Sequence, residues 1–236
     1  MIFIVIPVKE LNQAKERLSG FLNPKERRML VYAMLQDVMR SVLDSVTPSR
    51  KFIITKDDKA AELADSLGFE LIEESEQLSE SQSVDRASLS CMDMGAESVL
   101  RLPGDIPLVM PQEIDSVLKS ANLTPSIAMV PSRDHTGTNA MLRTPPNVIK
   151  SQFGPGSLRK HIQDAEELGI PYDVFNLPGI GQDIDDSMDL RRLVYKLKSL
   201  ASGIENQEIE NQGLKTIEAL CELGLFERID SMKLTG

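Results

Sequence analysis

The chain has 236 residues, 41% hydrophobic and 26% charged, so it can bury a sizeable core as one large domain or two small ones. Its 26 basic and 36 acidic residues give a formal charge of −10, which argues against a nucleic-acid partner and requires a local group of cations for any anionic ligand. Two cysteines without metal spacing exclude a disulfide scaffold and favour a cytoplasmic protein, and no run reaches the roughly 20 apolar residues of a membrane span.

Along the chain, short apolar runs that predict strands alternate with segments of helical spacing. The predicted strands are residues 2–7, 51–55, 69–72, 98–102, 126–130, 139–143 and 172–176. The predicted helices are residues 24–42, 57–67, 83–95, 111–121, 157–168 and 187–197. This alternation predicts an α/β fold with a mainly parallel sheet flanked by helices.

The C-terminal part of the chain departs from this alternation of predicted strands and helices. We expect a single domain over residues 1–200 and a C-terminal appendage over residues 201–236. The appendage is polar at first, and apolar residues between 217 and 225 then predict a terminal helix or docking segment.

Three cations follow the first predicted strand, and ligands of open α/β sheets bind beyond the carboxyl ends of strands. Lys9, Lys15 and Arg17 share one loop of an acidic protein, which suggests a clamp for a triphosphate. The alternative is an ordinary solvated surface. The usual glycine-rich phosphate loops are absent.

Three aspartates are candidate metal ligands. Asp105 follows the fourth predicted strand between two prolines, where a carboxylate could meet Mg²⁺ or could instead form a turn or cap a helix. Asp183 and Asp185 lie two residues apart, so in an extended segment their like charges point to one side and call for a cation between them. We assign the neighbouring Asp186 and Asp189 to capping of the next helix.

Two turns of small residues could hold a phosphate or carboxylate through Thr138, Gly154 and Ser157, since Ser157 opens a predicted helix. The alternative is ordinary turn and cap chemistry. His135 and His161 have no nucleophile beside them, and we interpret both as structural or surface residues.

Five stretches in order resemble the 2-phospho-L-lactate guanylyltransferase (CofC-type) family of deazaflavin coenzyme (F-420) biosynthesis. They are IPVKELNQAKERL, LPGDIPLV, DHTGTNAML, FGPGSLRKH and DIDDSMDL, spread between residue 2 and about residue 195. The resemblance implies a nucleotidyltransferase domain of GT-A type that joins GTP to a small phospho-acid and releases pyrophosphate. Family acids are 2-phospho-L-lactate, phosphoenolpyruvate and, in a few relatives, 3-phosphoglycerate; we favour the first.

The resemblance also implies roles for individual residues. Lys15 and Arg17 would contact the triphosphate. The aspartates Asp105, Asp183 and Asp185 would hold Mg²⁺, and Thr138, Gly154 and Ser157 would contact the acid.

The sequence departs from the family at the opening of the third long helix, where a Gly-Leu-Asn-like stretch is replaced by Ser83-Val84-Asp85. Asp85 could still accept hydrogen bonds from the N1–H and amino group of guanine.

Two other functions stay open. One is a nucleotidyltransferase for a sugar phosphate or molybdopterin, although those relatives open with a Gly-rich loop where this chain has Pro-Val-Lys. The other is a non-catalytic nucleotide-binding regulator, which need not keep three metal carboxylates. A homodimer is expected only because it is the commonest assembly.

Overall fold

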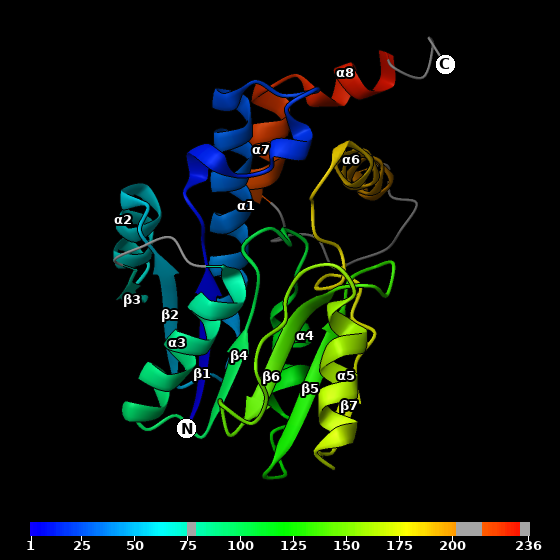
Figure 1. Ribbon diagram of the computed structural model, residues 1–236. Coiled ribbons are helices and arrows are strands. Elements are labelled where there is room, and N and C mark those ends of the chain that lie inside the picture. Colours follow the sequence, from blue (N-terminus) through cyan, green and yellow to red (C-terminus); the bar gives the residue numbers. More distant parts are fainter. Residues whose placement is uncertain (75–78, 202–213, 232–236) are drawn as a thin grey trace.

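The computed structural model describes residues 1–74, 79–201 and 214–231, and a seven-stranded sheet forms its centre (Figure 1). The strand order is β3-β2-β1-β4-β6-β5-β7. The strands are β1 Ile2–Pro7, β2 Arg50–Thr55, β3 Glu70–Glu73, β4 Ser98–Arg101, β5 Ser126–Pro131, β6 Thr138–Thr144 and β7 Tyr172–Val174. Each predicted strand is therefore present, with its ends within three residues of the prediction.

Strand β6 runs against the direction of the sheet. It pairs antiparallel with both β4 and β5, whereas β1 pairs parallel with β2 and β4, β2 with β3, and β5 with β7. The first residues of β6 therefore lie at the edge where β1 and β4 end. The prediction of a mainly parallel sheet is confirmed, and the reversed strand adds Thr138 and Asn139 to the ligand-binding edge.

Helices cover both faces of the sheet, as predicted. The helices that connect or directly follow the strands are α1 Pro24–Asp44, α2 Asp58–Ser66, α3 Glu80–Asp93, α4 Pro111–Leu118, α5 Ser157–Glu167 and α6 Ser187–Ala201. Two short 3₁₀ helices that were not predicted, η1 (Leu11–Gln13) and η2 (Glu16–Leu18), shape the loop after β1. Among the described residues, no helix is long and apolar enough to cross a membrane.

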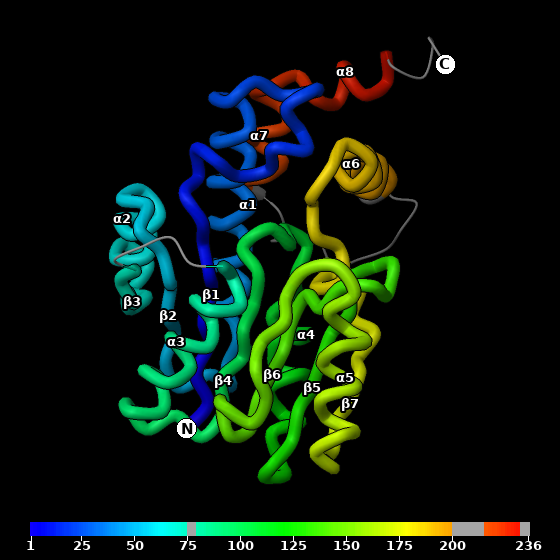
Figure 2. The backbone as a smooth tube through the Cα atoms, viewed as in Figure 1, coloured from blue at the N-terminus to red at the C-terminus, as the bar shows by residue number. Residues whose placement is uncertain are grey.

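The alternation of side chains along β1 divides the core into two layers. Ile4 and Ile6 pack in one apolar cluster with α1, α2 and α4. Phe3 and Val5 pack on the opposite face with Ala87 and other residues near α3, and α5 covers the same face further along the sheet (Figures 1 and 2). Near-continuous apolar strands are what a sheet covered on both faces requires.

Local capping explains where the helices begin. Asn23 Oδ1 accepts from the backbone N–H groups of Lys25 and Glu26, both at 3.0 Å, which confirms the predicted start of α1. Helix α3 begins at Glu80, three residues before its predicted start. Ser79 and Gln82 form a reciprocal capping box there, and apolar spacing alone does not reveal this start.

Two C-terminal helices follow: α7 (Leu214–Glu222) lies beside α1, and α8 (Leu225–Ser231) contacts α7 and α6 (Figure 2). The carboxylate of Asp37 in α1 accepts from the backbone N–H groups of Lys215 and Thr216 at 3.0 and 2.8 Å. Leu220, Leu225 and Ile229 are fully buried in the same cluster as α1. The predicted terminal helix is thus present and packed. The rest of the predicted appendage, residues 202–213 and 232–236, lies outside the described residues, and the boundary at residue 200 stays a prediction.

Replacing Leu220 by alanine should test whether α7 belongs to the cooperative core. Because its side chain is fully buried, we expect Leu220→Ala to lower the free energy of unfolding by about 2–5 kcal/mol in urea titrations. The exposed neighbour Cys221→Ala is the control and should change stability by less than about 0.5 kcal/mol. Equal unfolding curves for both variants would contradict a structural role for α7.

Candidate active site

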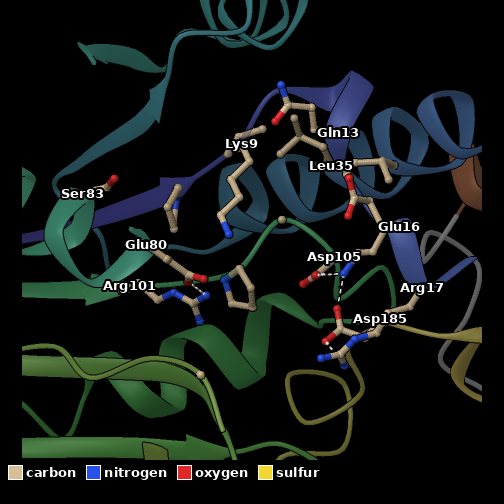
Figure 3. A pocket seen from close by; sticks show the side chains of 18 of the residues that line it. Lys9, Gln13, Glu16, Arg17, Leu35, Glu80, Ser83, Arg101, Asp105 and Asp185 are labelled. Carbon is tan, nitrogen blue, oxygen red and sulfur yellow. Dashed lines mark hydrogen bonds and ion pairs between the residues drawn. The ribbon is translucent and has the colours of Figure 1, made fainter. Parts of the chain in front are cut away.

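A cavity of about 540 Å³ opens at the carboxyl ends of β1 and β4 (Figure 3). Its walls come from the loops after these two strands, from α1, from the start of α3 and from the segments around Gly154 and Asp185. The volume is typical of sites for small molecules. The predicted site residues that line it are Lys9, Lys15, Arg17, Asp105, Gly154 and Asp185.

Lys15 stands at the centre of the charged cluster. It has a left-handed backbone conformation (φ 55°), and its ammonium donates to the carboxylates of Asp105 and of Asp185, the latter at 2.5 Å. The side chain of Lys15 is 10% exposed. Burial opposes the charged form, but the two carboxylates outweigh it and raise the pKa of Lys15. The more exposed Arg17 lies 3.9 Å from Asp185.

One backbone hydrogen bond explains why the distant aspartate motifs meet. The N–H of Ile184 donates to the carbonyl oxygen of Asp105 at 3.1 Å, so the residues on either side of Ile184 flank the loop after β4. Asp183 accepts from the side-chain amide of Asn139 at 3.0 Å. Burial, with the neighbouring Asp105 charge, raises the pKa of Asp183 to about 6.

The segment before Asp183 is anchored by a buried carboxylate on α4. Glu113 accepts from the N–H of Gly179 at 2.8 Å and from the N–H of Met110 at 3.1 Å, and burial raises its pKa. A Cβ at position 179 would collide with Glu113 and with the carbonyl oxygen of Leu108, so glycine is required there. Downstream, Asp186 and Asp189 accept backbone hydrogen bonds at the start of α6, which confirms their predicted capping role.

The aspartates suit a divalent cation in chemistry but do not converge as a ready-made metal site. Among the described residues, no three His, Cys, Asp or Glu side chains are grouped closely enough to hold a metal ion. Lys15 supplies the positive charge between Asp105 and Asp185. Within the described part of the chain, Asp105 Oδ1 is nevertheless buried with no hydrogen-bond partner, and no cation forms an ion pair with Asp183. Mg²⁺ prefers oxygen ligands, and carboxylate oxygens that have no neighbouring cation are suited to bind it.

Two of the predicted acid contacts have partners inside the fold. Ser157 is 1% exposed, and its Oγ accepts from the N–H of Thr138 at 2.8 Å. The Oγ1 of Thr138 lies 3.0 Å from Nδ1 of His161. These contacts connect the beginning of β6 to α5 outside the cavity wall, and a contact of either hydroxyl with the acid stays a prediction. Of the three predicted acid contacts, the cavity wall includes Gly154.

Asp85 also has partners inside the fold. Its carboxylate accepts from Arg143 Nη1 at 2.7 Å and from the hydroxyl of Ser151 at 2.7 Å, and it does not line the cavity. Arg143 is almost fully buried, so Asp85 neutralises a charge inside the fold, and its contact with the base stays a prediction. Ser83, on the same helix, lines the cavity instead.

His161 is a structural residue, as predicted. It is fully buried, and its Nε2 accepts from the N–H of Gln152 at 2.9 Å, so the ring proton is on Nδ1, facing Thr138. Burial, reinforced by the nearby Arg143 and Arg101, lowers the pKa of His161 to about 4. The exposed His135 lies in the turn before β6, with φ of 58°.

Sequence reasoning missed a second charged pair in the cavity. Arg101, the last residue of β4, is 7% exposed and forms an ion pair with Glu80 at the start of α3. A charged residue at the end of an otherwise apolar strand was a signal that could have found Arg101. Glu80 lies ahead of the predicted start of its helix, so no pattern pointed to it.

The fold and the placement of the site define an α/β protein of the nucleotidyltransferase-like class. A solved structure of a Desulfovibrio desulfuricans protein, assigned as a nucleotide-diphospho-sugar transferase, superposes with a TM-score of 0.71. The alignment covers 96% of both chains at 17% identity, which establishes similarity of fold.

The family is narrower than the fold. Residues 2–201 match the model of the family described as guanylyl transferase CofC like, and the chain belongs to that family. A phosphoenolpyruvate guanylyltransferase of Rubrobacter xylanophilus is 33% identical over 192 residues, covering 81% of this chain and 93% of the relative. A 2-phospho-L-lactate guanylyltransferase of Methanothermobacter thermautotrophicus is 30% identical over 190 residues, covering 80% and 82%.

The buried neutral His161 predicts a pH dependence of stability. Its pKa is about 4 in the folded protein and about 6.5 when unfolded, so between these values only the unfolded chain binds the proton. The contribution of His161 to the free energy of unfolding is therefore complete above pH 6.5, and it falls by roughly 3 kcal/mol as the pH drops to 4.

The measurement is the free energy of unfolding of the wild type relative to His161→Gln across pH 4 to 8. The wild type should lose stability relative to this variant on acidification, whereas the exposed-site control His135→Asn should keep the wild-type profile. A constant difference between wild type and His161→Gln across this range would contradict the assignment.

Proposed function

We propose that this protein transfers the guanylyl group of GTP to the phosphate of a small phospho-carboxylic acid, phosphoenolpyruvate or 2-phospho-L-lactate, and releases pyrophosphate. The observation that carries the proposal is the Lys15–Asp105–Asp185 cluster in the cavity of a chain that belongs to this family. Such a reaction would serve deazaflavin coenzyme (F-420) biosynthesis.

The reaction needs positioning and charge compensation more than proton transfer. An oxygen of the acid's phosphate forms a bond to the α-phosphorus of GTP, and the bond from that phosphorus to the β-phosphate bridging oxygen breaks. The electron pair leaves with pyrophosphate. Because the attacking oxygen is already ionised, no general base is required, and His161 is buried away from the cavity.

The chain's own cations would hold the triphosphate. Lys9, Lys15 and Arg17 line the cavity on the loop after β1 and would stabilise the charge that develops on the departing pyrophosphate. Mg²⁺, when bound by Asp105, Asp183 and Asp185, would neutralise charge between the two anionic reactants.

The identity of the acid rests on the relatives and not on the geometry. Several relatives are named for phosphoenolpyruvate and one for 2-phospho-L-lactate. The two acids carry the same phosphate and carboxylate, and small differences of shape are worth only about 1–3 kcal/mol. A homodimer and a cytoplasmic location remain predictions from the sequence.

The test is pyrophosphate release from GTP and Mg²⁺ with phosphoenolpyruvate, 2-phospho-L-lactate or 3-phosphoglycerate, with the product identified by mass. Turnover with a sugar phosphate alone would favour the alternative nucleotidyltransferase. Binding of GTP without pyrophosphate release from any acceptor would favour the non-catalytic regulator.

Replacing Asp105 by asparagine tests the proposed metal carboxylate. Asp105→Asn removes the negative charge that faces Lys15 and the proposed metal ion, so we expect turnover at saturating Mg²⁺ to fall by roughly 100-fold or more. The control is Asp173→Asn, at an exposed position on β7, which should keep wild-type turnover. Wild-type turnover by a folded Asp105→Asn variant would contradict the role.

A further inference from the structure

The two C-terminal helices have no role in the proposed mechanism, and they lie beyond residues 2–201, which match the family model. Helix α7 is anchored on α1 by Asp37, and α8 follows it after a turn at Gly224, where φ is 60°. Helix α8 borders both α6 and the loop after β1 (Figures 1 and 2). That loop carries Lys15, and α6 begins just after Asp185, so α8 contacts both segments of the charged cluster at a distance from the cavity.

Arg228 of α8 holds the turn between η2 and α1. Its Nη2 donates to the carbonyl oxygen of Phe21 at 2.6 Å, and its Nη1 donates to Oε1 of Glu26 at 2.9 Å. The guanidinium carbon of Arg228 lies 4.9 Å from the centre of the Phe21 ring. The other oxygen of Glu26 accepts from the N–H of Asn23 at 2.8 Å and closes the N-terminal cap of α1. A single arginine therefore contacts the backbone, the ring and the cap of this turn.

Backbone hydrogen bonds extend this contact to Lys15. The N–H of Phe21 donates to the carbonyl oxygen of Leu18 at 2.9 Å, and the N–H of Leu18 donates to the carbonyl oxygen of Lys15 at 2.9 Å. The side chain of Leu18 is fully buried in the same apolar cluster as Leu225 of α8. A left-handed conformation at a residue other than glycine persists only where its surroundings support it. The contacts of α8 supply part of that support at Lys15.

Lys198 connects α8 to α6. Its ammonium donates to the carboxylate of Asp230 and, at 3.1 Å, to the carbonyl oxygen of Phe226. At the other end of α6, the carboxylate of Asp189 accepts from the N–H of Asp185 at 3.2 Å. Helix α6 therefore links α8 to the carboxylate side of the charged cluster.

We propose that α8 positions the triphosphate end of the cavity, with Arg228 and Lys198 as its positioning residues. Arg228 fixes the loop that carries Lys15 and Arg17. Lys198 fixes α6, whose first turn holds Asp185. The inference rests on the proposed function and adds to it a role for helices outside the family match. Cations that are already held in place need not be ordered when GTP binds, so these contacts should raise the affinity for the triphosphate.

The experiment measures the KM for GTP at a saturating concentration of the acid that the wild type uses. It also measures the inhibition constant of GMP, which keeps the nucleoside and lacks the β- and γ-phosphates. For Arg228→Gln we expect the KM for GTP to rise roughly 5- to 20-fold, because the loop cations are less well positioned, while the inhibition constant of GMP stays within about twofold. Lys198→Gln should show the same pattern.

The double variant Arg228→Gln/Lys198→Gln tests whether the two residues act through one helix. A helix released at one end no longer fixes the other segment against it. The KM for GTP of the double variant should therefore be close to the larger of the two single-variant values. Two independent contacts would instead multiply their effects, and that result would overturn the inference.

Arg50→Gln is the matched control. Arg50 also pairs with a glutamate, Glu70, and its guanidinium carbon lies 4.9 Å from the centre of the Phe52 ring, but it does not line the cavity. The side chains of Arg50 and Arg228 are 32% and 36% exposed. Arg50→Gln should therefore lose a similar amount of stability to urea as Arg228→Gln and keep the wild-type KM for GTP.

An unchanged KM for GTP in folded Arg228→Gln would overturn the inference, since its contacts would then only stabilise the fold. An equal rise in the inhibition constant of GMP would also overturn it, because the loss would not be confined to the triphosphate. If Arg228→Gln does not fold, Arg228→Lys replaces it, since lysine keeps the charge and loses the paired donors; the KM for GTP should still rise. Failure of the proposed function has a separate signature, because the wild-type protein would then release no pyrophosphate with either acid.

Discussion

The site depends on one buried ammonium group held between two carboxylates. Lys15 joins Asp105 and Asp185, which lie 90 and 170 residues further along the chain, and it does so with a side chain that is only 10% exposed. Removing Lys15 would leave two neighbouring carboxylates without their shared counter-charge, so both aspartates depend on this one residue. The left-handed backbone at Lys15 aims the side chain inward, and the two flanking 3₁₀ helices fix that conformation.

The reversed strand β6 makes this cluster part of a larger site. A wholly parallel sheet would place the beginning of β6 at the opposite edge. Because β6 pairs antiparallel with β4, Asn139 lies where β4 ends, with its side chain on Asp183 and its carbonyl oxygen on Arg101. Glu113 and Gly179 then hold the returning chain, so that Asp183 and Asp185 reach the same edge. One inversion of strand direction thus unites four segments that are remote in sequence.

The sequence predicted the elements and the charged loops well, because both follow from local patterns. Apolar runs predicted the strands, the position after a strand predicted Lys15 and Asp105, and the two-residue spacing from Asp183 predicted Asp185. Three of the predicted site residues have partners that the sequence did not indicate. Thr138, Ser157 and Asp85 have the right chemistry at the right edge, but residue type and spacing do not reveal that an inner partner already uses the side chain. Those partners, His161 and Arg143, come from other elements and are known only once the chain is folded.

The same reasoning separates structural charge from functional charge in an acidic protein. Helix α3 supplies two carboxylates to two arginines of the sheet, and only the Arg101–Glu80 pair lines the described cavity. Asp85 is fixed by Arg143 and by both donors of Ser151, and its release would leave a buried guanidinium without a counter-charge. Glu80 stands at the first turn of the helix, and both Glu80 and Arg101 border the cavity. A chain with a net charge of −10 needs cations at the cavity to hold an anionic ligand, so an arginine at the cavity wall differs in its surroundings from one that is neutralised inside the fold.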